Sequence, residues 1–134
     1  MQITPAAEAG TRPAPAEYFT GHVWQEPIAE TATVPPLMAL KVSFAPGART
    51  HWHTHPLGQT LHVLSGIGLV QVKGAPAREI REGDTVWIAP GEVHWHGACA
   101  GRAMTHLALQ HAQDGSPVTW LDPVSDADYA AAAG

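Results

Sequence analysis

The sequence predicts an all-β fold, a single domain whose short strands close into a sandwich or a small barrel. The chain has 134 residues, which is within the usual size of one domain. It contains 13 glycines and 12 prolines, and 45% of its residues are hydrophobic while only 14% are charged. This composition is rich in turn formers and apolar enough for a core, so it favours many short strands over long helices.

Alternating apolar residues mark the strands, and glycine or proline turns separate them. The first strong run is 37–44, in which alternate side chains share one face; these are Met38, Leu40, Val42 and Phe44. Further strands are predicted at 51–55, 59–65, 68–72, 85–89, 93–98 and 103–110, with an edge strand at 117–121. A turn at Ser65-Gly66 is expected to separate the second and third of these. Strands at this spacing are typical of a sandwich or a closed barrel.

The chain is expected to divide into an N-terminal arm at 1–17, one barrel domain at 18–121 and a C-terminal tail at 122–134. Prolines interrupt the arm, and Pro27, Pro35 and Pro36 are expected to break the chain again before the first strong strand. The tail is expected to form a short helix over 125–132, because Ser125 can cap its start.

Charge and cysteine content exclude several classes of protein. Seven basic and twelve acidic residues give a net charge of -5, and the basic residues are scattered, so nucleic acid is not an expected partner. Cys99 is the only cysteine, which excludes an internal disulfide. No secretory signal is recognised, and no run approaches the roughly 18 apolar residues of a membrane span. We therefore expect a cytoplasmic protein with no membrane partner.

The chain has nine histidines, and six of them lie between His51 and His96. Side chains two apart in a strand point to the same side, so His53 and His55 project into one space about 7 Å apart. Gln59 follows on the next strand, and His94 comes from a distant one. Each of these residues alone is more simply a polar or core side chain, but together they suit a divalent manganese, iron, nickel or zinc ion.

Two motifs in this region resemble those of the cupin superfamily. The first has the pattern Gly-x5-His-x-His-x3-Glu-x6-Gly, which is matched by Gly47, His53, His55, Gln59 and Gly66, with Gln in place of the usual Glu. The second is matched by Gly83, Gly91 and His94, whereas Ala89 and Ala98 depart from its Pro and Asn. The resemblance implies a single-domain jelly-roll β-barrel with His53, His55, Gln59 and His94 as metal ligands.

A narrower resemblance is to the bacterial manganese-dependent cupin hydroxynitrile lyases. It lies in Pro-Gly-Ala-Arg-Thr-His-Trp-His-Thr-His-Pro-Leu-Gly-Gln-Thr-Leu, in Pro-Gly-Glu-Val-His-Trp-His-Gly-Ala and in Ala-Met-Thr-His-Leu-Ala-Leu-Gln, which ends at Gln110. In that group a Gln ligand is typical. The resemblance implies one divalent ion per subunit, manganese first and iron, nickel or zinc as alternatives. It also implies reversible cleavage of a cyanohydrin such as mandelonitrile to an aldehyde and cyanide.

Residues on the late strand are candidates for catalysis. His106 and Gln110 share a strand face with Met104 and Ala108, so both are expected to line the cavity that holds the metal. Our hypothesis is that the metal holds the cyanohydrin hydroxyl while His106 removes its proton. Cleavage of the carbon-carbon bond then releases aldehyde and cyanide.

Thr50 is a candidate on which the resemblance and the strand pattern disagree. The resemblance implies that its hydroxyl bonds the substrate oxygen, but strict alternation back from His53 places His51 on the inner face instead. A bend after Pro46-Gly47 would resolve the conflict, and a solvated turn hydroxyl is the alternative. The remaining cavity residues are expected to be Leu40, Val42, Phe44, Leu61 and His96, for which plain core packing is the simpler reading.

Large aromatic residues on the faces opposite the ligands predict self-association. Trp52, Trp87 and Trp95 are expected to point outward, so a homo-oligomer, a dimer or tetramer, is predicted; packing beneath loops is the competing explanation.

Two other functions use the same predicted metal site. One is an iron-dependent dioxygenase, and the other is a non-catalytic metal-binding sensor.

Overall fold

The computed structural model describes all residues, Met1–Gly134, as an antiparallel β structure with one α-helix and one 3-10 turn. The helical elements are η1 (Ala6–Glu8) and α1 (Asp126–Ala133). The strands are β1 (Arg12–Pro13), β2 (Phe19–Thr20), β3 (Val23–Glu30), β4 (Leu37–Phe44), β5 (Arg49–Thr50), β6 (His53–Thr54), β7 (Gln59–Val72), β8 (Arg78–Arg81), β9 (Thr85–Ile88), β10 (His94–Ala98), β11 (Met104–His111) and β12 (Thr119–Trp120). No helix is long and apolar enough to cross a membrane.

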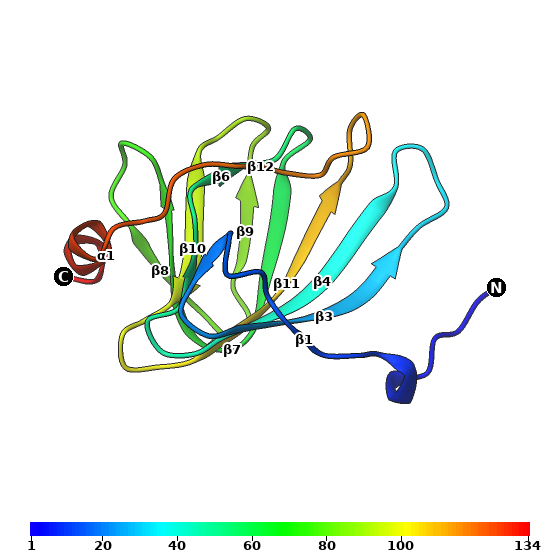
Figure 1. The fold of residues 1–134 in the computed structure, drawn as a ribbon, viewed down its shortest axis with the longest axis horizontal. Coiled ribbons are helices and arrows are strands. Elements are labelled where there is room, and N and C mark those ends of the chain that lie inside the picture. Colours follow the sequence, from blue (N-terminus) through cyan, green and yellow to red (C-terminus); the bar gives the residue numbers. More distant parts are fainter.

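The strands form one curled sheet in the order β1-β3-β4-β11-β7-β10-β5-β2. β8 and β9 pair with β7, and β6 pairs with both β10 and β12. Figure 1 shows this sheet as a half-barrel, with α1 at the left beside β8 and with β3 at the right. The predicted all-β jelly-roll barrel and the short C-terminal helix are therefore confirmed.

β7 is the long strand that joins the two halves of the sheet. Its first residues pair with β9 and β11, and its last residues pair with β8 and β10. The bend between them falls at Gly66, whose φ is 81° and whose Cβ would overlap the carbonyl oxygen of Ala103. The prediction of a turn at Ser65-Gly66 is wrong, because the glycine bends the strand without ending it.

Two further elements differ from the prediction. Pro27 does not end its segment, since β3 continues to Glu30 with a register irregularity between Pro27 and Ala29. β8 was not predicted, because its sequence Arg-Glu-Ile-Arg has one inward apolar residue, Ile80, and no visible alternation.

The inner faces of the strands carry apolar residues deep in the barrel and polar residues near its opening. The main core cluster includes Phe44, Leu61, Val63 and Met104, all nearly inaccessible to solvent. Phe44 and Met104 pair where β4 ends and β11 begins, Val63 and Leu61 follow on the inner face of β7, and Gln59, the first residue of β7, lies two residues beyond Leu61 on that face. The apolar residues therefore close the floor of the barrel, and the polar residues lie toward its open end.

The two ends of the chain cover this open end. β1 of the N-terminal arm pairs with β3, and β12, just before the C-terminal tail, pairs with β6. Tyr18 stacks on Trp120, with ring centroids 4.8 Å apart and 11° between the ring planes. The segments next to the arm and the tail therefore meet above the cavity.

The C-terminal helix and the residues before it cover two of the three tryptophans that were expected to point outward. Trp52 and Trp95 are buried in a second cluster with Val124 and Tyr129, so these two leave no surface for a partner subunit to cover. Packing beneath the tail, the competing explanation, holds for these two. Trp87 on β9 is 62% exposed, as predicted.

Candidate metal centre and cavity

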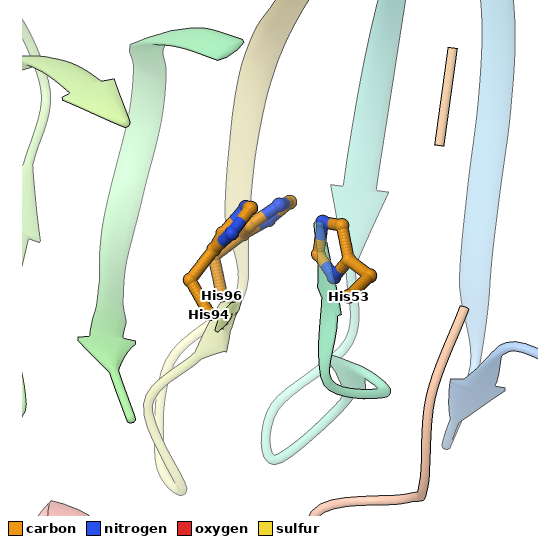
Figure 2. A group of neighbouring side chains, drawn as sticks. All are labelled: His53, His94 and His96. Atoms are coloured by element: carbon orange, nitrogen blue, oxygen red, sulfur yellow. The ribbon is translucent and has the colours of Figure 1, made fainter. Parts of the chain in front are cut away.

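Three imidazole rings gather at the inner face of β6 and β10. His53 pairs in register with His94, and His96 follows two residues later on the same face of β10. Figure 2 shows the rings of His94 and His96 projecting toward the ring of His53. One ring nitrogen of each residue lies within 4.8 Å of the others, and all three residues are buried.

His55 and Gln59 extend this group. The ring centroid of His55 lies 5.0 Å from that of His53 and 5.5 Å from that of His94. Gln59 Oε1 lies 3.1 Å from His94 Nε2, and Gln59 Nε2 donates to Gln110 Oε1 at 3.2 Å. The four residues predicted as ligands therefore do meet, although they come from three strands and a turn.

Backbone carbonyls fix which nitrogen of each ring is free to bind. His53 Nδ1 lies 2.9 Å from the carbonyl oxygen of His51, and His94 Nδ1 lies 2.9 Å from that of Glu92. His55 Nδ1 lies 2.6 Å from the carbonyl oxygen of Pro117. Because a carbonyl only accepts, each Nδ1 carries the proton, and each Nε2 presents a lone pair.

The resulting set of atoms fits a divalent cation. His94 Nε2 and Gln59 Oε1 both bring lone pairs, yet they lie 3.1 Å apart with no proton to share. Two ligand atoms at right angles around one ion, each about 2.1 Å from it, would be about 3 Å apart. His55 Nε2 is also buried and lacks any hydrogen-bond partner. A cation would satisfy all of these lone pairs.

The histidines are uncharged near neutral pH, as metal ligands must be. Burial, followed by the nearby rings of His94 and His55, holds the pKa of His53 well below its usual value. Burial lowers the pKa of His94 to about 4, and it also lowers the pKa of His55. The cluster of His53, His94 and His96, with His55 beside it, thus indicates a site for one divalent ion.

His96 lies almost as near to His53 as His55 does, with ring centroids 5.2 Å apart against 5.0 Å, and it belongs to the three-histidine cluster. Its Nδ1, however, hydrogen-bonds His106 Nε2 at 2.9 Å, whereas no ring nitrogen of His53, His55 or His94 is bonded to another histidine. His96 Nε2 is buried without a partner. His96 therefore joins the metal cluster to His106.

Thr50 and His106 both face the cavity. The strand predicted at 51–55 is wrong as a continuous element, because the chain forms β5 and β6 with an interruption at His51 and Trp52. This interruption puts Thr50 and His53 on the same side. Thr50 Oγ1 accepts from the His96 backbone N–H at 3.2 Å, so its own proton is free to donate into the cavity.

The cavity has a volume of about 250 Å³. Leu40, Val42 and His96 line it as expected, together with Gln110. Phe44 and Leu61, also expected in its wall, are not among the lining residues because they lie one step deeper in the core. The ring of Phe44 instead backs His106, with centroids 5.3 Å apart.

Sequence reasoning missed the residues that the chain ends bring to the cavity. They are Arg12 and Pro15 from the arm, Tyr18 next to it, and Pro117, Val118 and Trp120 from the segment that precedes the tail. One signal was present, since Tyr18 and Trp120 are large aromatics in segments otherwise rich in small residues and proline. Aromatic residues in such segments commonly anchor them to a core or a pocket.

The cupin domain model matches residues 40–109. The chain belongs to the cupin family, as its two motifs predicted. It is 46% identical over 129 residues to an (R)-mandelonitrile lyase from Granulicella tundricola, an alignment that covers 96% of this chain and 98% of that protein.

Solved structures agree with this assignment of the fold. A cupin-like protein from Thermotoga maritima is 39% identical, with a TM-score of 0.82 over 87% of this chain and 89% of that chain. A cupin-2 domain from Rhodospirillum rubrum has a TM-score of 0.74 at 17% identity and covers 100% of this chain and 95% of that chain. The second likeness bears on the fold alone.

Proposed function

We propose that this protein is a metal-dependent hydroxynitrile lyase that reversibly cleaves cyanohydrins such as mandelonitrile to an aldehyde and cyanide. The observation that carries the proposal is a cavity in which neutral metal-binding side chains lie beside a free hydroxyl and an uncharged buried histidine pair. The 46% identity to an (R)-mandelonitrile lyase supports this reaction over others known for the fold.

The proposed ligands are His53, His55, Gln59 and His94, holding one ion per subunit. Manganese is proposed first, with iron, nickel or zinc as alternatives, because imidazole and amide ligands accept all four. When bound, such an ion supplies Lewis acidity toward the substrate oxygen, and the absence of a carboxylate ligand leaves its full charge available.

The chain's own residues handle the proton. Thr50 Oγ1 is oriented by the His96 backbone and donates its hydrogen bond to the substrate oxygen. Burial lowers the pKa of His106 to about 4, so its ring is neutral and able to accept the hydroxyl proton. The electrons of the breaking carbon-carbon bond leave with cyanide, which takes that proton from His106 as hydrogen cyanide departs.

The walls favour a substrate with one ring or a short aliphatic chain. A cavity of about 150 Å³ is enough for benzene, so the 250 Å³ here has room for an aromatic ring with its reacting substituents. Leu40, Val42 and Tyr18 give this space apolar sides, and Gln110 adds an amide near the ligands. Mandelonitrile matches this combination.

The test measures bound metal and cyanide release on the same purified sample. His106→Ala should lower turnover by about 10² to 10⁴ without loss of metal. His111→Ala is the matched control, because His111 is exposed on the same β11 and should retain full activity. Full activity in His106→Ala would remove the assignment of the base.

Two further variants test the ligand set. His55→Ala should lose metal, whereas His96→Ala should retain it, since His96 is bonded to His106 instead. If His55→Ala retained the metal and His96→Ala lost it, His96 would be the ligand in place of His55. A metal-loaded protein that releases no cyanide but consumes oxygen with iron would favour a dioxygenase, and one without turnover would favour a sensor.

We also propose that the protein is a cytoplasmic homo-oligomer, a dimer or tetramer. Trp87 and Trp24 are 62% and 43% exposed, and both lie on strands of the outer sheet surface. Large exposed aromatics of this kind are enriched in protein interfaces. Light scattering should give a mass of two or four chains, and Trp87→Lys should lower it; a monomeric wild-type protein would contradict the proposal.

A further inference from the structure

The cavity contains one ionic side chain, and it is positive. Of the 19 residues that line the cavity, Arg12 alone is permanently charged, and none is acidic. A bound divalent cation would add positive charge, so the cavity favours anions even though the whole chain carries -5.

Arg12 is held at the rim by the fold. It pairs in register with Gln25 where β1 joins β3, and its Nε donates to Gln25 Oε1 at 3.4 Å. Gln25 is itself buried and lines the cavity. The backbone pairing and this side-chain bond both keep the guanidinium beside the opening.

The guanidinium of Arg12 has no acidic partner. The ion pairs of the chain join Lys41 to Glu26, Arg49 to Asp126 and Arg81 to Glu79, and none includes Arg12. Its two terminal nitrogens make no hydrogen bond, since only Nε is engaged. A planar guanidinium with two free nitrogens is suited to bind a carboxylate through two parallel hydrogen bonds.

We propose that the preferred substrates carry a carboxylate at the end remote from the reacting carbon, and that Arg12 recognises it at the cavity mouth. The inference rests on the proposed lyase function for the chemistry at the other end of the substrate. Thr50 and the metal ligands receive the hydroxyl end, the apolar walls receive the ring, and Arg12 receives the anionic end. Arg12 is thus a specificity-determining residue and takes no part in proton transfer.

The test compares two ligands that carry the same aldehyde and ring and differ at the remote end, where one has a carboxylate and the other a neutral ester. Binding of 4-formylbenzoate and of its neutral methyl ester to the metal-loaded protein is measured by calorimetry without cyanide, and kcat/KM is then measured with cyanide. Arg12 is exposed, so the expected preference for the carboxylate is modest, roughly two- to fivefold, and smaller at high salt.

Three variants make the result specific. Arg12→Gln should abolish the preference while leaving binding of the methyl ester unchanged, and Arg12→Lys should keep part of it. Arg102→Gln is the matched control, because Arg102 is an exposed arginine that does not line the cavity. It should bind both ligands as the wild type does.

Each outcome decides one question. Equal binding of the two ligands by the wild type, or an equal loss for both in Arg12→Gln, would overturn the inference and leave Arg12 a structural residue. Cleavage of mandelonitrile together with equal use of the charged and neutral ligands would support the proposed function and refute only the preference for a carboxylate. A charge preference that Arg12→Gln removes, in a protein that releases no cyanide, would keep the anion site and refute the lyase.

Discussion

Gln110 holds the side-chain amide of Gln59 in one of its two orientations. Gln59 Nε2 donates to Gln110 Oε1 at 3.2 Å, and this leaves Gln59 Oε1 3.1 Å from His94 Nε2. Gln110→Met removes the acceptor and keeps a side chain of similar length. We expect weaker metal binding, because the amide nitrogen of Gln59 is then free to turn toward the ligand nitrogens.

The size of the effect follows from this one bond. A hydrogen bond between neutral groups contributes about 1 kcal/mol, which is about fivefold in a binding constant. Groups that orient metal ligands typically contribute about 10- to 100-fold. We therefore expect the Kd for Mn²⁺ to rise about five- to tenfold, measured on metal-stripped protein by competition with a chromophoric chelator.

Two matched variants distinguish loss of the Gln59 amide orientation from a general loss of stability. Gln110→Glu keeps an acceptor oxygen and should keep the metal affinity. Gln71→Met removes the acceptor of the Trp95 Nε1 hydrogen bond, 2.8 Å long and outside the cavity, and should alter stability alone. An unchanged Kd in Gln110→Met, beside a clear loss in Gln59→Met, would refute the argument that Gln110 orients the ligand.

Three further predictions concern stability and turnover. In metal-free protein, the neutral His106 contributes stability above the unfolded-state pKa of 6.5 that is lost as the pH falls toward its folded pKa of about 4. His106 contributes about 3 kcal/mol to the free energy of unfolding at neutral pH. In His106→Gln, the free energy of unfolding in urea should therefore change less between about pH 7 and about pH 4; an unchanged pH dependence would contradict this. Thr50→Val should lower kcat at least roughly tenfold at full metal content, and steady-state assays that find wild-type kcat would remove its role. Tyr129→Phe should cost about 1 kcal/mol in urea unfolding, since the Tyr129 hydroxyl donates to the buried Ala98 carbonyl at 2.7 Å; no change would show that bond to be redundant.

The parts of the fold that the sequence predicts well are those with strong local periodicity. β4 spans the predicted residues 37–44, because alternate apolar side chains face one core. The convergence of His53, His55, Gln59 and His94 was also predicted, from the two motifs together. Their spacing is set by strand pleating and tight turns, which are local properties of the chain.

The parts that were missed depend on contacts between distant segments. Nothing local shows that Gly66 bends β7 around Ala103 instead of ending it, because both conformations use a glycine with positive φ. The interruption between β5 and β6 is similarly set by the tail, since the Trp52 N–H donates to the Asp122 carbonyl at 2.9 Å. Residues near both ends of the chain, such as Arg12 and Val118, become cavity walls only once the sheet has curled.

The bond from His55 to the Pro117 carbonyl joins groups 62 residues apart, and it makes the metal centre a reporter of completed folding. A nascent or partly folded chain that has paired β6 with β10 but has not docked its C-terminal segment from Pro117 onward would hold His55 without a fixed ring orientation. Such a chain should capture metal more slowly than the finished protein, because long-range closure is among the late events of β-sheet folding. Metal uptake followed during refolding would then trail the gain of strand structure and coincide with burial of Trp52 beneath the tail.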